Sequence, residues 1–125
     1  MADLDQTAQS DRAVQLLHAL GYLYETHGQT KRGLVLLLIA ARLCPDHIGV
    51  LRTLAHAFLA DGSPQRAMAV IDRLRSMGGG DHPLNDLLTS QALWAAGREM
   101  EARRYFRDFL DRRQTNEVNQ ADQHV

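Results

Sequence analysis

Three glycines recur along this chain at nearly equal intervals, and this spacing constrains the fold more than any other feature. Gly28, Gly62 and Gly97 stand 34 and 35 residues apart. The neighbouring residues keep the same interval: Gly33 corresponds to Ala67 and Ala102, and Leu17, Leu20 and Tyr24 correspond to Leu51, Leu54 and Phe58. Self-similarity at a period of about 34 residues indicates stacked units of two helices joined by a turn.

Apolar periodicity and helix-ending residues predict six helices, over residues 12–27, 31–43, 47–62, 64–77, 83–96 and 98–113. Pro45 ends the second helix because the residue before a proline is pushed out of helical geometry. Asp46 is then a candidate cap for the third helix, and Ser63 caps the fourth. The run Gly78–Gly80 predicts the one internal hinge. We expect residues 1–10 to be mobile, 11–113 to form one domain of three repeats, and 114–125 to be a disordered tail.

Three apolar stretches are expected to build or extend the core. In the first helix one buried stripe is predicted, made of Leu16, Leu17, Leu20, Leu23 and Tyr24. The apolar run 34–41 is too short for a membrane span, since eight helical residues reach about 12 Å across a hydrocarbon layer of about 30 Å. It predicts a helix packed on more than one face. The last helix has no successor to cover its apolar face, so Tyr105 and Phe109 are a candidate second binding surface.

Composition argues against several classes of partner. The chain is 45% hydrophobic and 23% charged with a formal charge of −1, which gives no general attraction to nucleic acid or to anionic membranes. The single cysteine, Cys44, excludes an intramolecular disulfide and favours a reducing compartment. The polar, acidic first residues do not resemble a secretory signal, so none is expected.

Residue types that carry chemistry are present but are not arranged for it. No two of the six histidines stand three or four residues apart on a helix, so we expect no metal site. The glycines 78–80 lack the lysine and hydroxyl residue of a phosphate-binding loop. Arginines between 98 and 113 alternate with acidic residues, which predicts a solvated face rather than a nucleic-acid site. We therefore expect neither an enzyme nor a cofactor.

A groove formed by the first helices of the three units is the better functional candidate. Its predicted binding residues are those that the core stripe does not use: His18, Tyr22, Glu25, Arg52, His56, Leu59, Leu87, Gln91 and Trp94. Aromatic, leucine and arginine side chains together suit an amphipathic peptide, because such residues are favoured anchors at interfaces. The alternative for Leu87 and Trp94 is a place in the core.

The first repeat resembles the tetratricopeptide consensus in Leu20-Gly21, Tyr24, Gly28, Ala40 and Pro45, and the likeness extends over residues 14–113. The second repeat departs from it with Ala55 and Gly79 in the glycine and proline positions, and the third has Thr89 and Ser90 in place of the usual leucine and glycine. The resemblance implies an all-α fold of three stacked helix–turn–helix repeats, six helices in a right-handed α-solenoid.

The segment Leu43-Cys44-Pro45-Asp46-His47-Ile48 is similar to a turn of the small YscY-type (SctY) chaperones of bacterial type III secretion. That resemblance implies a cytoplasmic protein, peripheral at the secretion apparatus, that binds a small exported YscX-type protein and presents it to the export gate. From the residues themselves we expect no catalysis, no nucleic-acid binding and no membrane insertion. The alternatives are a general tetratricopeptide adaptor, a chaperone for a needle subunit or translocator, and a self-associating scaffold.

Overall fold

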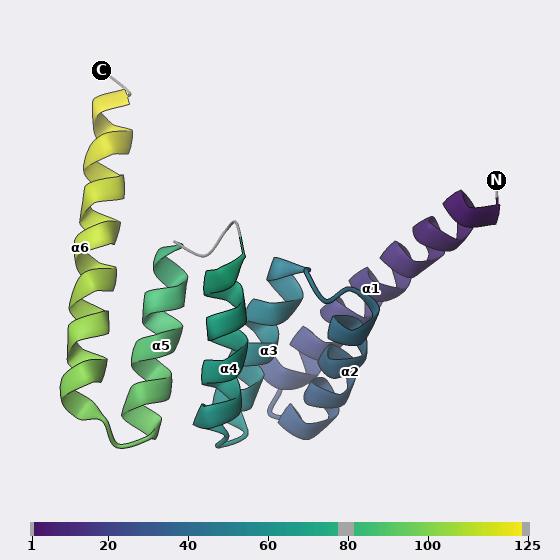
Figure 1. The fold of residues 1–125 in the computed structure, drawn as a ribbon, viewed down its shortest axis with the longest axis horizontal. Helices are drawn as coiled ribbons and strands as arrows, with labels where there is room; N and C mark the ends of the chain where they lie inside the picture. Colours follow the sequence, from purple (N-terminus) through teal and green to yellow (C-terminus); the bar gives the residue numbers. More distant parts are fainter. Residues whose placement is uncertain (1, 78–81, 124–125) are drawn as a thin grey trace.

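The computed structural model describes residues 2–77 and 82–123, which form six helices and no strand. The helices are α1 (Ala2–Thr26), α2 (Thr30–Leu43), α3 (Ile48–Ala60), α4 (Pro64–Ser76), α5 (Pro83–Ala95) and α6 (Glu99–Gln123). Figure 1 shows them side by side in chain order, with α1 and α2 at one end of the row and α6 at the other. The predicted all-α class is confirmed. The hinge predicted at Gly78–Gly80 lies outside the described residues.

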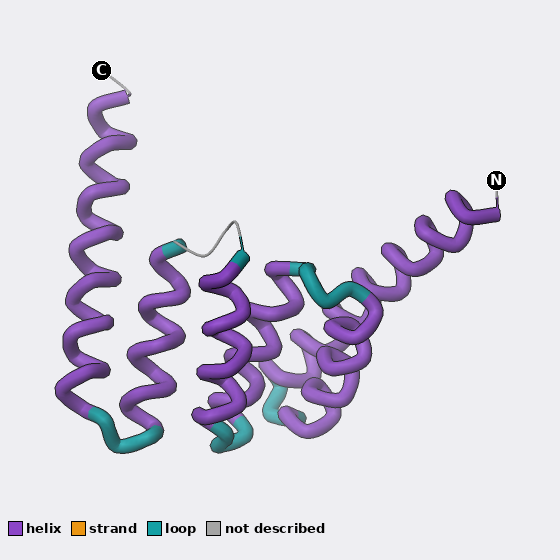
Figure 2. Tube along the Cα trace, in the orientation of Figure 1, coloured by secondary structure: helices purple, strands orange, loops and turns teal. Residues whose placement is uncertain are grey.

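The four inner helices lie where the periodicity predicted them, but both terminal helices are longer. α1 begins at Ala2 rather than at residue 12, and α6 continues to Gln123 rather than ending at 113. Both extensions project beyond the neighbouring helices (Figure 2). In α6, local contacts support the extra turns, because Arg113 pairs with Glu117 at 3.3 Å and the Thr115 hydroxyl donates to the Asp111 carbonyl. The assignment of residues 1–10 as mobile and 114–125 as disordered stays a prediction.

The three glycine turns have one geometry. Gly28, Gly62 and Gly97 adopt φ values of 81°, 76° and 81°, a region that other residues rarely enter. In each turn the amide after the glycine donates to the carbonyl five residues earlier, at 2.8 Å every time: Gln29 to Tyr24, Ser63 to Phe58, and Arg98 to Leu93. The sequence interval therefore corresponds to a repeated backbone conformation.

Histidines cap two of the helices, which the sequence did not indicate. His47 Nδ1 accepts from the Val50 amide at 3.0 Å at the start of α3, where Asp46 was predicted as a cap. His82 Nδ1 accepts from the Leu84 amide at 3.1 Å at the start of α5. Each ring uses the lone pair of its Nδ1, so each cap requires that this nitrogen be unprotonated.

The core consists of three linked apolar clusters. The first joins α2, α3 and α4 through Leu34, Leu37, Leu54, Ala57, Phe58 and Ala67. The second joins α3, α4 and α5 through Ala55, Ile71, Leu88 and Ala92. The third joins α1, α2 and α3 through Val14, Ala40 and Val50. Leu59 and Val70 pack against both the first and the second cluster, so the apolar interior is continuous along the row.

The stripe predicted for α1 is wrong for three of its five residues, while Leu17 and Tyr24 are half-buried and Leu17 packs against the third cluster. Leu16, Leu20 and Leu23 are exposed by 60%, 37% and 50%, whereas Val14 and Glu25 are buried. α1 faces its neighbours with Val14 and Leu17 near its middle and with the small Gly21 and the polar Glu25 further along. A Cβ added to Gly33 would lie 2.8 Å from the Gly21 carbonyl oxygen, which shows how closely the backbones of α1 and α2 approach.

More of the apolar surface of α2 is exposed than the sequence predicted. It buries Leu34, Leu37 and Ala40, but Val35, Leu38 and Ile39 on its other side are about half exposed. No further helix lies beyond this end of the row in the described residues (Figure 1). The apolar run predicted to pack on several faces therefore packs on one.

Buried polar groups join α4, α5 and α6. The Asp86 side chain is 6% exposed, and its two oxygens lie 3.1 Å from Arg75 and 3.1 Å from Arg112. Arg75 also donates to the Thr89 hydroxyl at 2.8 Å, and the Ser90 hydroxyl donates to the Ala102 carbonyl at 2.8 Å. Thr89 and Ser90, which replace the usual leucine and glycine of the third repeat, are therefore buried with their hydroxyl groups hydrogen-bonded.

Candidate functional site

A hollow of about 390 Å³ lies between α1, α3 and α5. Its lining comprises Tyr22, Glu25, Thr26, Arg52, Thr53, His56, Leu84, Leu87, Leu88 and Gln91. The structure thus brings together Tyr22, Glu25, Arg52, His56, Leu87 and Gln91 of the predicted groove residues. They come from three helices that are distant in sequence, and each faces the same space.

Glu25 and His56 form the polar centre of the hollow. His56 Nδ1 lies 3.0 Å from Glu25 Oε1 and links α3 to α1. The Glu25 side chain is 7% exposed, while that of His56 is 56% exposed. The carboxylate is therefore held beneath the surface, and the imidazole that covers it faces solvent, where a bound segment would contact it.

Arg52 offers an unsatisfied donor at the same place. Its Nε is buried and has no hydrogen-bond partner in the part of the chain that the structure describes. A buried donor without an acceptor costs free energy, of order 1–3 kcal/mol, that a ligand carbonyl or carboxylate would recover. Burial lowers the pKa of His82, and the positive charge of Arg52 lowers it further.

His18 adjoins the hollow without lining it. Its Nε2 lies 2.8 Å from the Thr53 hydroxyl, which itself donates to the Gly49 carbonyl at 3.0 Å. Because the threonine proton is already used, His18 Nε2 is the donor in this pair. Burial lowers the His18 pKa, and the His47 ring, whose centroid lies 5.7 Å away, lowers it further. His18 therefore positions Thr53, a lining residue that the sequence analysis missed.

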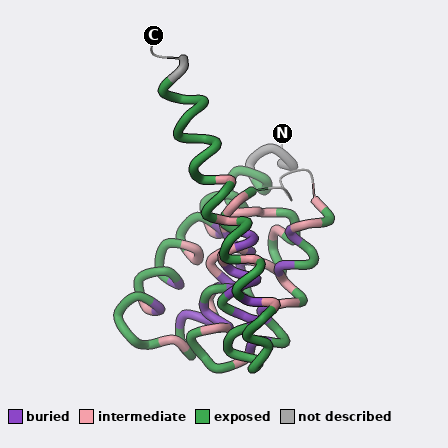
Figure 3. The backbone as a smooth tube through the Cα atoms, turned by 90° about the vertical axis from the view of Figure 1, so that its left-hand side faces the viewer, coloured by how far each residue is buried: buried purple, intermediate pink, exposed green. Residues whose placement is uncertain are grey.

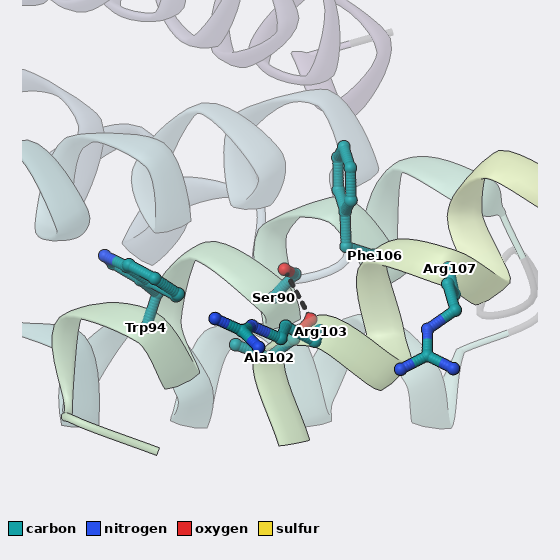
Figure 4. A pocket seen from close by; sticks show the side chains of 6 residues that line it. All are labelled: Ser90, Trp94, Ala102, Arg103, Phe106 and Arg107. Atoms are coloured by element: carbon teal, nitrogen blue, oxygen red, sulfur yellow. Dashed lines mark hydrogen bonds between the residues drawn. The ribbon is translucent and has the colours of Figure 1, made fainter. Parts of the chain in front are cut away.

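Two of the predicted groove residues lie elsewhere. Leu59 is half-buried and packs against two core clusters, because its helical position faces α4 as well as α5. Trp94 is 55% exposed and lines a separate pocket of about 280 Å³ between α5 and α6. Figure 4 shows this pocket, with Trp94 on one helix and Arg103, Phe106 and Arg107 on the other. α5 therefore contributes to two distinct sites.

The exposed apolar residues of α6 are not the two that were predicted for the candidate second binding surface. Tyr105 is half-buried between the guanidinium groups of Arg75 and Arg104, at 5.6 and 5.7 Å from its ring centroid. Phe109 is half-buried with its ring 6.1 Å from that of Phe106. Phe106 and Leu110 are the exposed members, at 43% and 42%. Helical periodicity predicted the apolar face of α6, but it did not predict which residues of that face α5 covers.

Leu88 was also missed as a lining residue. It is 8% exposed and belongs to the second core cluster, yet it forms part of the floor of the hollow. Only its position next to Leu87 indicates in the sequence that Leu88 could line the hollow. A pattern that assigns each residue either to the core or to the groove places Leu88 in the core.

Among the described residues, no group of three or more histidine, cysteine, aspartate or glutamate side chains is placed to hold a metal ion. None of the helices in residues 2–77 and 82–123 is both long and apolar enough to cross a membrane. Comparison with models of known protein families found no match for the chain, and comparison with curated proteins found none either.

Proposed function

We propose that this chain is a non-enzymatic chaperone of the tetratricopeptide type, in which three stacked helix pairs form a right-handed α-solenoid. The three equal glycine turns support this arrangement, as do the buried small residues Gly33, Ala67 and Ala102 at equivalent positions after them. Stacked pairs of this kind use the first helix of each pair to form an extended binding surface. The helices that line the hollow, α1, α3 and α5, are the first helices of the three pairs.

The composition of the hollow carries the proposal. Leu84, Leu87 and Leu88 supply an apolar floor, and Tyr22 is a half-exposed aromatic side chain at its edge. Arg52 lines the same hollow, and its buried Nε lacks an acceptor among the described residues. An amphipathic segment satisfies both parts, because its apolar side chains contact the leucines and a carbonyl or carboxylate accepts from Arg52.

The bound segment belongs, in this proposal, to a small exported protein of the YscX type in bacterial type III secretion. The turn of residues 43–48 is the basis for that choice of partner. The chaperone keeps the partner soluble in the cytoplasm by covering its apolar residues and presents it to the export gate. Partner binding then raises the apparent stability of the chaperone by mass action.

Co-expression with a YscX-type protein tests this function. Tyr22→Ala and Leu87→Ala should each weaken the complex by about 1–3 kcal/mol in a binding titration, because each removes an anchor without removing core packing. Val118→Ala is the matched control, since Val118 is 58% exposed and lies far along α6 from the hollow. Wild-type affinity in both hollow variants, or a melting temperature that the partner does not raise, would overturn the proposal.

A self-associating scaffold is the second candidate, and the exposed apolar end of the row favours it. Leu16, Leu20 and Leu23 on α1 and Val35, Leu38 and Ile39 on α2 are all about half exposed. Exposed apolar surface marks interaction sites in many proteins. A monomer by light scattering at high concentration would remove this candidate.

A further inference from the structure

The pocket between α5 and α6 has features of a binding site separate from the hollow. It measures about 280 Å³ and is lined by Ser90, Trp94, Ala102, Arg103, Phe106 and Arg107. Trp94 and Phe106 are about half exposed, while Ser90 and Ala102 are buried beneath them. The pocket is therefore an apolar recess with exposed aromatic rings at its edge.

The floor of this pocket offers no unsatisfied hydroxyl group to a ligand. The only hydroxyl in the lining, that of Ser90, donates to the Ala102 carbonyl at 2.8 Å (Figure 4). A side chain that fills the recess therefore meets satisfied groups, so an apolar one is preferred to a polar one.

Two exposed cations at the rim can pair with a ligand of opposite charge. Arg103 and Arg107 stand one turn apart on α6, and neither makes an ion pair or side-chain hydrogen bond in the part of the chain that the structure describes. The ion pairs of α6 use other arginines: Arg98, just before the helix, binds Glu101, while Arg112 binds Asp86 and Arg113 binds Glu117. No acidic residue lines the pocket. Its electrostatic complement is one or more carboxylates.

The end of the row where the pocket lies is open. Among the described side chains of α6 only Ala102 is buried, and Figure 3, which views the molecule from this side, shows α6 exposed along most of its length. Arg103, Phe106 and Arg107 are all exposed, so these turns of the helix are accessible to another polypeptide.

We propose that this pocket binds an acidic peptide segment of a partner protein, with an apolar side chain seated between Trp94 and Phe106 and flanking carboxylates paired with Arg103 and Arg107. Tryptophan and arginine are the residues most enriched at energetic centres of interfaces. Acidic residues 99, 101, 108 and 111 alternate with the arginines along α6, which disfavours an extended polyanion such as a nucleic acid and favours a short segment. The pocket and the hollow share no lining residue.

Trp94 is the only tryptophan of the chain and lines this pocket, so its fluorescence reports on ligands bound there. The probe is a synthetic twelve-residue peptide with the core Glu-Asp-Leu-Phe-Asp-Glu, and the matched probe carries Gln and Asn in place of the acids. We expect the acidic peptide to change Trp94 emission in a saturable way that weakens with salt. The double variant Arg103→Gln/Arg107→Gln should bind about tenfold more weakly, since each exposed pair contributes modestly.

Arg66→Gln is the control, because Arg66 is an exposed arginine on α4 outside both sites. Tyr22→Ala should leave the fluorescence titration unchanged, which separates this site from the hollow and its proposed partner. Equal binding of the neutral peptide would overturn the proposal. So would an emission change that depends on protein concentration without peptide, which indicates a second copy of the chain, or a response to a thymidine oligonucleotide and not to the acidic peptide.

Discussion

The first and last helix pairs share one turn geometry but are held together by different forces. α1 and α2 approach so closely that Gly21 and Gly33 leave no space for a Cβ between them. α5 and α6, with α4, are joined by the buried carboxylate of Asp86 between two arginines and by the Ser90 hydroxyl. The first pair depends on shape and the last on charge. The repeated backbone therefore fixes where helices meet and leaves the chemistry of the contact free to vary.

Gly33→Ala should have the largest effect on stability. The added methyl would lie 2.8 Å from the Gly21 carbonyl oxygen and 3.1 Å from the Glu25 amide nitrogen, and neither backbone atom can move away alone. We expect a loss of about 3 kcal/mol in the free energy of unfolding, measured by urea denaturation.

Ala102 provides the comparison, because it occupies the equivalent position in the last pair and its methyl group is accommodated there with 1% exposure. Ala102→Gly should cost less, about 1–2 kcal/mol, through helix propensity and the loss of one buried methyl group. Equal losses in the two variants would show that the first pair is no tighter than the last.

Asp86→Ala should have the next largest effect. It removes the acceptor shared by Arg75 and Arg112 and leaves two cations facing each other. Because the two arginine side chains are 32% and 38% exposed, water compensates in part, and we expect a loss of about 2 kcal/mol. High salt should reduce this difference but not that of Gly33→Ala. The same salt response in both variants would remove the distinction between shape and charge.

Mild acid should have the smallest effect. The pKa values of His18 and His82 are lowered from 6.5, so the unfolded chain binds protons that the folded chain does not. Their contribution to stability is complete above pH 6.5 and is lost as the pH falls through the lowered pKa values. The melting temperature should therefore fall from neutral to mildly acid pH, and less steeply in His18→Gln/His82→Asn, where asparagine still caps α5. An unchanged slope in this variant would contradict the assignment.

The sequence predicted the parts of this fold that depend on local rules. The glycine turns, Pro64 at the first position of α4 and the buried face of α3 all follow from conformational preference and spacing. The errors arose where burial depends on what lies beside a helix. Leu16 and Val35 fit a core pattern but are exposed, because nothing in the described residues covers that end of the row. Trp94 fits the groove pattern of α5 but faces α6. The position of a residue along a helix does not show which neighbouring helix it faces.

α3 is the one helix that contributes to all three apolar clusters, through Val50, Ala55 and the group around Phe58. In a row of helices that contact mainly their neighbours, opening can start at either end and stop before the middle. Loss of α1 or α6 packing would leave the amides of α3 protected from exchange with solvent. A segment bound across α1, α3 and α5 would therefore connect the end helix α1, which opens readily, to α3, which stays folded longest. Its binding would then increase the number of helices that unfold together.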